Sequence, residues 1–350
     1  MKSTTQAYRL MRLAAFGALL TMTSACDFIQ DGGQNATSEI GLYPVELEGR
    51  WGYINAQGRM IIEPQFSFTT EFSEGVAAVR TGNWSRGYID ATGEYVIEPQ
   101  FQDAQRFSEG LAAVRFDGRW GYIDKSGSFV LNPQYTSASP FSNGRAWIRT
   151  SDFNWEYIDK SGNLVRTDDT PRFDENSEPM FSDGLALVQD DGVFGYIDSD
   201  AHPFIPPQYA DARAFSDGRA AIKISDRWGY IDKKKNTVLS PQYISAGSFG
   251  DGLAPVRQSG NTWGYINESG SLVIQEQYEE ARSFSYGRAA VRMNDKWGFI
   301  DTRGNLSTAI EFDAVGDFRN GLARVYIYGE NSEKMGYVDT SGRYVWYPTE

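Results

Sequence analysis

The sequence predicts an all-β protein made of about nine tandem repeats, and three observations lead to this prediction. A segment reading RWGYIDKSGSFVLNPQY at residues 119–135 recurs in variant form along the chain. Aromatic residues make up 14% of the 350 residues and 36 are glycine, a composition typical of short strands and tight turns. No long stretch carries the apolar spacing of an amphipathic helix.

Two sequence markers keep the same phase from repeat to repeat, which establishes the repeats. The first is the glycine of a Trp-Gly pair, whose successive copies lie 34 to 39 residues apart. The equivalent positions are Gly52, Gly87, Gly121, Glu156, Gly195, Gly229, Gly264, Gly298 and Gly336. The second marker, Phe-Ser-x-Gly, begins at Phe72, Phe107, Phe141, Phe181, Phe215 and Phe284, with looser copies at Phe249 and Phe318.

Each repeat predicts a meander of three short antiparallel strands. In the third copy the expected strands are GLAAVR at 110–115, WGYID at 120–124 and SFVL at 128–131. A linker of the form Pro-Gln-Tyr-x-x-Ala-x-x-Phe-Ser joins each meander to the next. The proline cannot donate to a sheet ladder, so we expect it to mark the end of the meander.

The turn after the second strand is predicted by an aspartate followed three residues later by a glycine, as in Asp124 and Gly127. The aspartate side chain caps such a turn and the glycine accepts a positive φ. The same pattern occurs at Asp90, Asp159 and Asp301. These aspartates are therefore interpreted as turn formers rather than calcium ligands, because the alternating acids of an EF-hand are absent.

Inside the second strand, Trp120 and Tyr122 are expected on one side of the sheet, with Gly121 and Ile123 on the other. A glycine within a strand indicates that another group approaches the backbone closely. We expect this group to be an aromatic ring from the neighbouring repeat.

The recurring pattern WGYID..G..VI.PQY..A..FSEG.A.V resembles the WG repeat of bacterial proteins over roughly residues 41–347. The Trp-Gly pair is kept at Trp51, Trp120, Trp228, Trp263 and Trp297. The departures are Phe194, Met335, the displaced Trp84, and Trp155, which is followed by Glu156. Glu156 predicts looser packing of the fourth repeat. The resemblance implies an interaction or surface-binding scaffold without a defined catalytic constellation.

Two architectures fit residues 41–350 as a single repeat domain. An open, β-solenoid-like array is favoured slightly, because both ends of the domain fall between whole three-stranded units. The alternative is a closed, β-propeller-like ring, which usually has four strands per blade. Neither end of the repeat array has an obvious polar cap, and this observation argues against the open array.

Residues 1–25 resemble a bacterial lipoprotein signal peptide, with Lys2, Arg9 and Arg12 before a short apolar run. The resemblance implies acylation of Cys26, the single cysteine, and ordinary cleavage after Ala25 is the rival interpretation. Residues 26–40 then form the lipidated cysteine and a polar tether. We expect an exported domain, anchored to a membrane, without disulfides. Asp27 resembles an inner-membrane retention signal, but the choice of membrane stays open.

The composition disfavours several classes of function. Loss of residues 1–25 removes three positive charges and changes the net charge from −13 to −16, so nucleic acid is not an expected partner. His202 is the single histidine, which leaves no residues for a triad, a Cys-His dyad or a histidine zinc site. No phosphate-binding glycine loop precedes a helix. We therefore predict no catalytic residues, no metal and no cofactor.

Three functions remain to be compared, and the sequence does not identify the ligand-binding residues or the oligomeric state. The first is a lipid-anchored scaffold of the cell envelope that binds a partner protein along its repeat surface. The second is a peptidoglycan- or carbohydrate-binding lipoprotein that uses exposed repeated aromatics. The third and most remote is a carboxylate-dependent hydrolase. It would use acids of the insertion 166–179, namely Asp168, Asp169, Asp174, Glu175 and Glu178.

Overall fold

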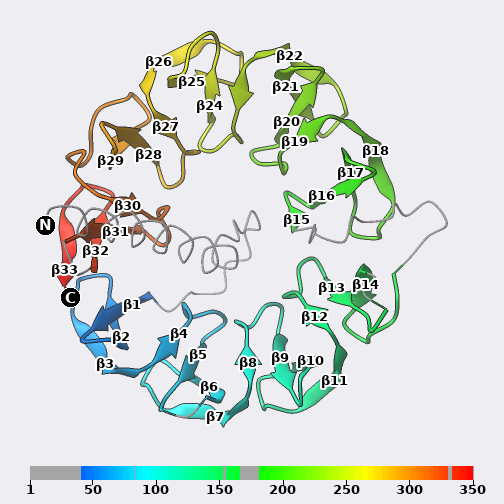
Figure 1. The fold of residues 1–350 in the computed structure, drawn as a ribbon, viewed down its shortest axis with the longest axis vertical. Coiled ribbons are helices and arrows are strands. Elements are labelled where there is room, and N and C mark those ends of the chain that lie inside the picture. Colours follow the sequence, from blue (N-terminus) through cyan, green and yellow to red (C-terminus); the bar gives the residue numbers. More distant parts are fainter. Residues whose placement is uncertain (1–40, 83, 153–154, 166–180, 330–332, 350) are drawn as a thin grey trace, which may run out of the picture. The chain divides into compact units, whose positions relative to one another are not determined.

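The repeats form a closed ring of nine small antiparallel sheets, a nine-bladed β-propeller (Figure 1). The computed structural model describes residues 41–349 except 83, 153–154, 166–180 and 330–332, and these residues belong to one unit, Asn35–Glu350. The described residues contain strands and turns but no helix. The all-β prediction and the count of nine repeats are therefore confirmed.

Blade 3 illustrates how a repeat folds. From the axis outward it consists of β8 (Asp103–Ala104), β9 (Ala112–Phe116), β10 (Arg119–Ile123) and β11 (Phe129–Tyr135). The three longer strands match the predicted meander. The prediction of three strands missed the inner strand β8, which has two residues and lies in the segment interpreted as a linker.

The other blades follow the same order along the chain. Blade 1 has β1 (Leu42–Leu47), β2 (Arg50–Asn55) and β3 (Met60–Phe66); blade 2 has β4 (Phe68–Thr69), β5 (Ala77–Arg80), β6 (Arg86–Ile89) and β7 (Tyr95–Phe101). Blade 4 has β12 (Ser137–Ala138), β13 (Arg145–Arg149) and β14 (Trp155–Asp159); blade 5 has β15 (Phe181–Ser182), β16 (Leu185–Asp190), β17 (Val193–Ile197) and β18 (Pro203–Tyr209).

The second half of the ring continues this pattern. Blade 6 has β19 (Asp211–Ala212), β20 (Arg219–Ile224), β21 (Arg227–Asp232) and β22 (Thr237–Tyr243); blade 7 has β23 (Ser245–Ala246), β24 (Leu253–Arg257), β25 (Trp263–Asn267) and β26 (Leu272–Tyr278). Blade 8 has β27 (Glu280–Ala281), β28 (Arg288–Met293) and β29 (Lys296–Asp301); blade 9 has β30 (Ala314–Val315), β31 (Leu322–Tyr328), β32 (Glu333–Asp339) and β33 (Tyr344–Thr349).

The glycine of the Trp-Gly pair is required by the backbone of its own blade. A Cβ atom on Gly121 would lie 2.6 Å from the carbonyl oxygen of Leu131 and 2.8 Å from the nitrogen of Pro133, both in β11. The register between β10 and β11 shifts at this point, so β11 bulges toward the glycine. The prediction that a neighbouring aromatic ring approaches this glycine is therefore wrong. In blade 4, where Glu156 replaces the glycine, the described residues contain no such outer strand.

The proline of the Pro-Gln-Tyr segment lies within the outer strand and does not end it. Strand β11 runs through Pro133 to Tyr135, and β7 runs through Pro99 to Phe101. The expectation that proline marks the end of the meander is therefore wrong. Proline is tolerated there because each outer strand is an edge strand with a bulge, where a missing N–H costs no ladder bond.

The predicted turns are confirmed. The Asp124 carboxylate accepts hydrogen bonds from the backbone N–H of Ser126 at 2.9 Å and of Ser128 at 3.1 Å. Gly127 follows with a φ of 82°. Asn55 and Asn267 make the same contacts in blades 1 and 7, so the turn needs an oxygen acceptor rather than a charge.

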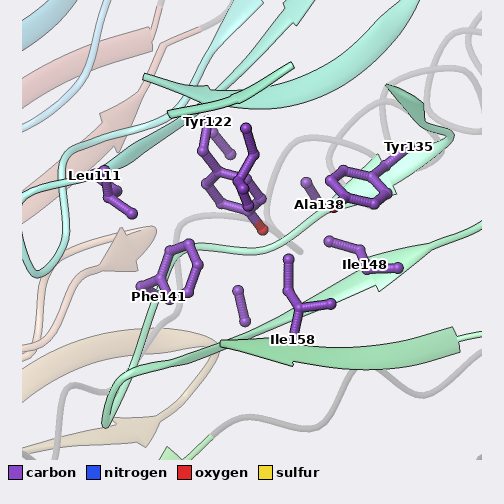
Figure 2. Close-up of a cluster of buried hydrophobic side chains, with 10 residues drawn as sticks. Leu111, Tyr122, Tyr135, Ala138, Phe141, Ile148 and Ile158 are labelled. Carbon is purple, nitrogen blue, oxygen red and sulfur yellow. The ribbon is translucent and has the colours of Figure 1, made fainter. Parts of the chain in front are cut away.

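Neighbouring blades are joined by an aromatic pair (Figure 2). Tyr122 of blade 3 is fully buried, and its ring meets Phe141 of blade 4 edge to face at 4.8 Å between centroids. Its hydroxyl donates a 2.8 Å hydrogen bond to the carbonyl oxygen of Ser139, also in blade 4. The same hydrogen bond to a carbonyl seventeen residues onward is made by Tyr53, Tyr88, Tyr196, Tyr230 and Tyr265.

The ring closes between whole blades. The turn at Gly58 in blade 1 lies against the backbone of Val345 in blade 9, as Gly93 of blade 2 lies against Ile62 of blade 1. Tyr43, Val45, Leu322 and other residues of both blades form one buried cluster. The closed ring, kept as the alternative, is therefore the architecture found, and the slight preference for an open array is wrong.

Replacing Gly121 with alanine tests the bulge. The added methyl group meets backbone atoms that cannot move independently, so we expect the free energy of unfolding to fall by about 2–4 kcal/mol. Urea denaturation followed by tryptophan fluorescence measures this change. Gly82→Ala is the matched control, because no heavy atom lies within 4 Å of its Cβ position. Equal denaturation midpoints for the two variants would contradict this account of the glycine.

Candidate interaction surface

Several residues singled out from the sequence lie outside the described part of the chain. They are Cys26, with the whole of residues 1–40, and the five acids of the insertion, Asp168, Asp169, Asp174, Glu175 and Glu178. The structure therefore tests neither the lipid anchor nor the remote hydrolase.

His202 lies in the turn between β17 and β18. Its side chain is exposed, and Nδ1 is 3.5 Å from a carboxylate oxygen of Asp198. Asp198 itself caps this turn through the backbone N–H groups of Asp200 and His202, at 2.9 Å each. The histidine thus belongs to a solvent-exposed turn. Within the described residues, no group of three or more His, Cys, Asp or Glu side chains is arranged to hold a metal ion.

The tryptophans of the Trp-Gly pairs are packed rather than displayed. Trp228 and Trp297 are buried, while Trp51, Trp120 and Trp263 are half-buried. Arginines cover three of these rings, with guanidinium carbons 5.1 Å from Trp228, 5.3 Å from Trp263 and 4.7 Å from Trp297. The Trp-Gly pairs therefore do not form an open aromatic ladder for sugar rings.

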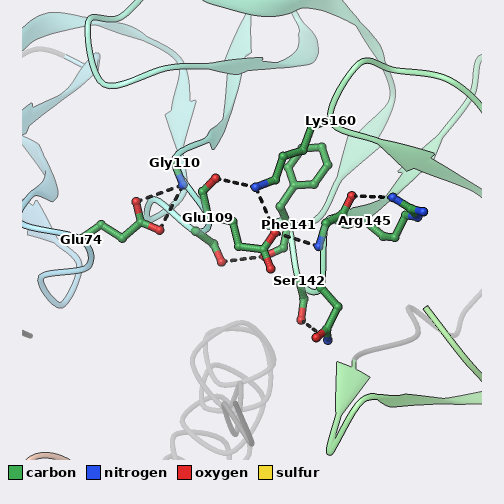
Figure 3. Close-up of polar contacts among 10 residues, drawn as sticks. Glu74, Glu109, Gly110, Phe141, Ser142, Arg145 and Lys160 are labelled. Carbon is green, nitrogen blue, oxygen red and sulfur yellow. Dashed lines mark hydrogen bonds and ion pairs between the residues drawn. The ribbon is translucent and has the colours of Figure 1, made fainter. Parts of the chain in front are cut away.

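The face that carries the Phe-Ser-x-Gly hairpins is sealed by polar contacts between blades (Figure 3). The Glu74 carboxylate accepts from the N–H of Gly110 in the next blade at 3.1 Å, and Lys125 lies 3.3 Å away. Glu109 makes the same contacts with Gly144 at 2.8 Å and Lys160 at 3.2 Å. These acids recur at equivalent positions and join neighbouring blades.

Two of the blade junctions on this face carry the opposite charge arrangement. Arg145 of blade 4 pairs with Asp200 of blade 5 at 3.1 Å, and Arg219 of blade 6 pairs with Glu268 of blade 7 at 2.9 Å. Here the cation belongs to the earlier blade and the acid to the later one. Such exposed pairs contribute little stability individually, but they disfavour incorrect neighbours.

The outer strands carry an apolar row that sequence reasoning missed. Ile61, Val96, Val130 and Val273 occupy the same position in β3, β7, β11 and β26, and each side chain is 41–45% exposed. We call these four residues the rim row. A sequence signal was present, because each precedes another apolar residue and only one of two adjacent strand residues can face the core.

Three of the four strands that carry the rim row also contain a proline. Pro64, Pro99 and Pro133 lie three residues after Ile61, Val96 and Val130, and prolines on an edge strand hinder strand addition. A partner at the rim would therefore contact side chains rather than extend a sheet. At the opposite end of blade 2 from its Phe-Ser-x-Gly hairpin, Trp84 is 85% exposed in the loop between β5 and β6, and Arg80 lies over its ring at 5.3 Å.

The described structure defines a repeat β-propeller, a class whose fold supports a binding or protein-interaction role. The profile of the WG containing repeat matches residues 51–83, 87–120, 120–152, 194–228, 228–261, 263–297 and 297–330. The chain belongs to the WG containing repeat family. Residues 153–193, which include Glu156, are not matched. No helix of the described residues is long and apolar enough to cross a membrane.

Several solved structures are similar to this chain at low identity. The computationally designed Ika8 protein is 13% identical, with a TM-score of 0.44, over 80% of this chain and 95% of that one. BamB from Moraxella catarrhalis is 12% identical, with a TM-score of 0.44, over 82% and 93%. The dihydro-heme d1 dehydrogenase NirN is 10% identical, with a TM-score of 0.48, over 87% and 72%. Values this low carry no argument about function. Among curated proteins, none matches the sequence.

Acid should destabilise the ring through its turn aspartates. The pKa of Asp124 is lowered by hydrogen bonds from Ser126 and Ser128, and the pKa values of Asp90, Asp159 and Asp232 are lowered in the same way. A lowered folded-state pKa gives stability that is complete above the unfolded value of 3.8 and is lost as pH falls through the folded value. We expect the urea concentration at the midpoint of unfolding to decrease once the pH is below about 4.

Replacing these four aspartates with asparagine should flatten that acid dependence, because asparagine keeps the acceptor, as in Asn55, and removes the titration. The control removes four charges that make no side-chain hydrogen bond or ion pair among the described residues, through Glu48→Gln, Glu63→Gln, Glu98→Gln and Asp226→Asn. If the variant with four asparagines loses stability in acid as steeply as the control variant and the unaltered protein do, the turn aspartates do not cause the acid dependence.

Proposed function

We propose that the protein is a non-catalytic scaffold of the bacterial cell envelope, lipid-anchored at Cys26, that binds a partner protein through its rim row. The observation that carries this proposal is the repeated exposure of Ile61, Val96, Val130 and Val273 at one position of the outer strands. Exposed β-branched side chains cost solvation and are not needed for the packing of the ring.

The distribution of the other side chains supports a binding role. Many of the acids that repeat among the described residues cap turns, as Asp124 does, or join blades, as Glu74 does, and three of the Trp-Gly tryptophans are packed under arginines. Nucleic acid is disfavoured by the acidic charge.

A carbohydrate partner is the second candidate, and one observation favours it. Tyr344 and Tyr347 of β33 stack at 4.9 Å, and Tyr347 is 71% exposed. The carboxylate of Glu311 accepts from the Tyr344 hydroxyl at 3.2 Å, which adds a polar group beside the rings. This platform would bind a cell-wall glycan independently of the Trp-Gly pairs.

A photo-crosslinking residue placed at Val130 tests the proposed partner surface. In cells that express the full chain, we expect one discrete, saturable protein adduct, which mass spectrometry identifies. The same residue at Ser126, in the turn that precedes β11, is the matched control. Val96→Asp in the crosslinking protein should reduce the adduct at least about tenfold, because a charge disrupts apolar burial. Adducts from Ser126 alone, or glycan retention lost with Tyr347→Ala, would overturn the rim proposal.

The anchor is tested by replacing Cys26 with alanine. We expect labelling by an alkyne fatty acid to be lost and the protein to move from the membrane pellet to the soluble fraction, because no acyl chain remains. Ser24→Ala serves as the control, since it keeps the cysteine and a small residue before it. A Cys26→Ala protein that still sediments with membranes would refute the lipid anchor.

A further inference from the structure

The hairpin face repeats one polar contact at five blade junctions, and we call this contact the clasp. In each of these Phe-Ser-x-Gly hairpins the residue x has a positive φ, and its carboxylate reaches the hairpin of the next blade. There it accepts a hydrogen bond of 2.7–3.1 Å from the N–H of the hairpin glycine, in the pairs Glu74–Gly110, Glu109–Gly144, Asp183–Gly218, Asp217–Gly252 and Asp251–Gly287. The clasp therefore places one carboxylate at each of these junctions.

The junction between blades 8 and 9 has no clasp. Tyr286 takes the place of the acid, with a φ of 54°, and it is 54% exposed. Its hydroxyl donates to Oδ1 of Asn320 in the hairpin of blade 9, at 3.4 Å. The N–H of Gly321, the glycine equivalent to Gly110, has no acceptor among the described residues. A donor that five other junctions satisfy with a carboxylate is therefore available to a ligand.

An arginine at this junction also lacks the carboxylate that its equivalents hold. Arg145, Arg219 and Arg288 follow the hairpin glycine in blades 4, 6 and 8. The Nη2 atom of Arg145 lies 3.1 Å from the Asp200 carboxylate, and that of Arg219 lies 2.9 Å from the Glu268 carboxylate. Both acids belong to the turn before the outer strand of the next blade. At two junctions, then, this Nη2 atom holds a carboxylate.

The turn of blade 9 offers Arg288 no such acid. Thr340 occupies the position of Glu268, and its carbonyl oxygen accepts from Arg288 Nε at 2.6 Å. The Nη1 atom donates to the carbonyl oxygen of Gly287 at 2.8 Å. The Nη2 atom has no hydrogen-bond or ion-pair partner among the described residues. This guanidinium therefore carries its charge without the carboxylate that its equivalents have.

The acids around this junction have other partners. Asp301 and Asp339 cap the turns of blades 8 and 9 by accepting from backbone N–H groups. Asp317, in the hairpin of blade 9, pairs with Arg282 at 3.4 Å. None of these three carboxylates takes the place of the clasp.

We propose that the junction between blades 8 and 9 binds a carboxylate group of another molecule, held by the Nη2 atom of Arg288 and the N–H of Gly321. The same kinds of donor hold carboxylates at the other junctions, which favours this group over a phosphate. A hydrogen bond between ionised partners is about twice as strong as one between neutral groups. The site uses no residue of the rim row, so the inference goes beyond the proposed function and does not depend on it.

A junction with a clasp shows how one carboxylate meets both kinds of donor. Between blades 3 and 4, the Glu109 carboxylate lies 2.8 Å from the nitrogen of Gly144 and 3.2 Å from Nζ of Lys160 (Figure 3). Lys160 occupies the same turn position as Thr340, against which the Arg288 guanidinium lies. A carboxylate at the hairpin glycine of blade 9 would thus meet Arg288 where Glu109 meets Lys160.

An NMR titration of the full chain with acetyl-glutamyl amide, followed through the backbone amide shifts, tests the site. We expect a saturable shift of the Gly321 amide with a Kd of about 1–50 mM, because a single exposed ion pair binds weakly. The Gly252 amide, whose junction has a clasp, should not respond. Arg288→Gln should weaken binding at least about fivefold, because it removes the charge. The equivalent change Arg219→Gln should leave the affinity unaltered.

Acetate as a second probe identifies the source of the carboxylate. The methylene groups of an acidic side chain gain contact with the exposed ring of Tyr286, and acetate has none to offer. Binding of acetyl-glutamyl amide at least about threefold tighter than acetate would assign the site to a side chain of another protein. Equal affinities would assign it to a free small acid.

Tyr286→Glu supplies the missing carboxylate from within the chain. We expect the Gly321 amide hydrogen to exchange about tenfold more slowly than in the unaltered protein, because the clasp is then complete. The added probe should no longer shift this amide. Tyr286→Gln is the matched control, since it has the same length without the charge and should still bind the probe.

Two results would overturn the proposal. A shift of the Gly321 amide that sodium chloride reproduces at the same ionic strength would show an effect of salt rather than a carboxylate site. Equal exchange rates of the Gly321 amide in Tyr286→Glu and Tyr286→Gln would show that this junction does not accept a carboxylate.

Discussion

The tyrosine that each blade sends into the next is the interaction on which the ring depends. In seven blades its ring is buried against the following blade and its hydroxyl donates to a carbonyl oxygen there, which a single blade could not provide. In blade 4 the ring of Tyr157 stacks on Phe181, and its hydroxyl has no hydrogen-bond partner among the described residues. Blade 8 separates the two contributions. Phe299 has no hydroxyl, yet it keeps the edge-to-face contact with Phe318 at 4.8 Å. The ring contact between blades therefore persists where the hydrogen bond is missing.

The same requirement explains why the array closes. An open array would leave the last tyrosine, Tyr337, and the apolar first blade exposed at its two ends. In the ring, Tyr337 donates to the carbonyl oxygen of Pro44 at 2.8 Å and its ring meets Tyr43. Closure thus removes both ends at once, which accounts for the lack of a polar cap at either end of the repeats. A blade shared between the termini is unnecessary, because side chains seal the seam.

The sequence predicted correctly those features that neighbouring residues determine, such as the turns. It failed for features that depend on other strands or on all nine blades together. The turn at Asp124 follows from side-chain capping alone, and the three longer strands follow from their length and composition. The strand at Asp103–Ala104 is too short to show a period, and the bulge opposite Gly121 depends on the path of another strand. Ring closure depends on the rotation from each blade to the next, summed over all nine blades. The rim row at Val96 was predictable from its apolar neighbour Ile97, whereas Cys26 and the acidic insertion lie outside the described residues.

The residues that the repeats share are used within the ring, so recognition must depend on positions outside this common framework. A rim row repeated at equal intervals would offer a partner several equivalent registers. The rim row has members only in blades 1, 2, 3 and 7. Among the described residues, blades 4 and 8 have no regular outer strand, and the repeat spacing is longer after each. Trp84 and the Tyr344–Tyr347 platform add features that occur once. A repeated surface supplies contact area, while these irregular blades favour one orientation of a bound partner over the others.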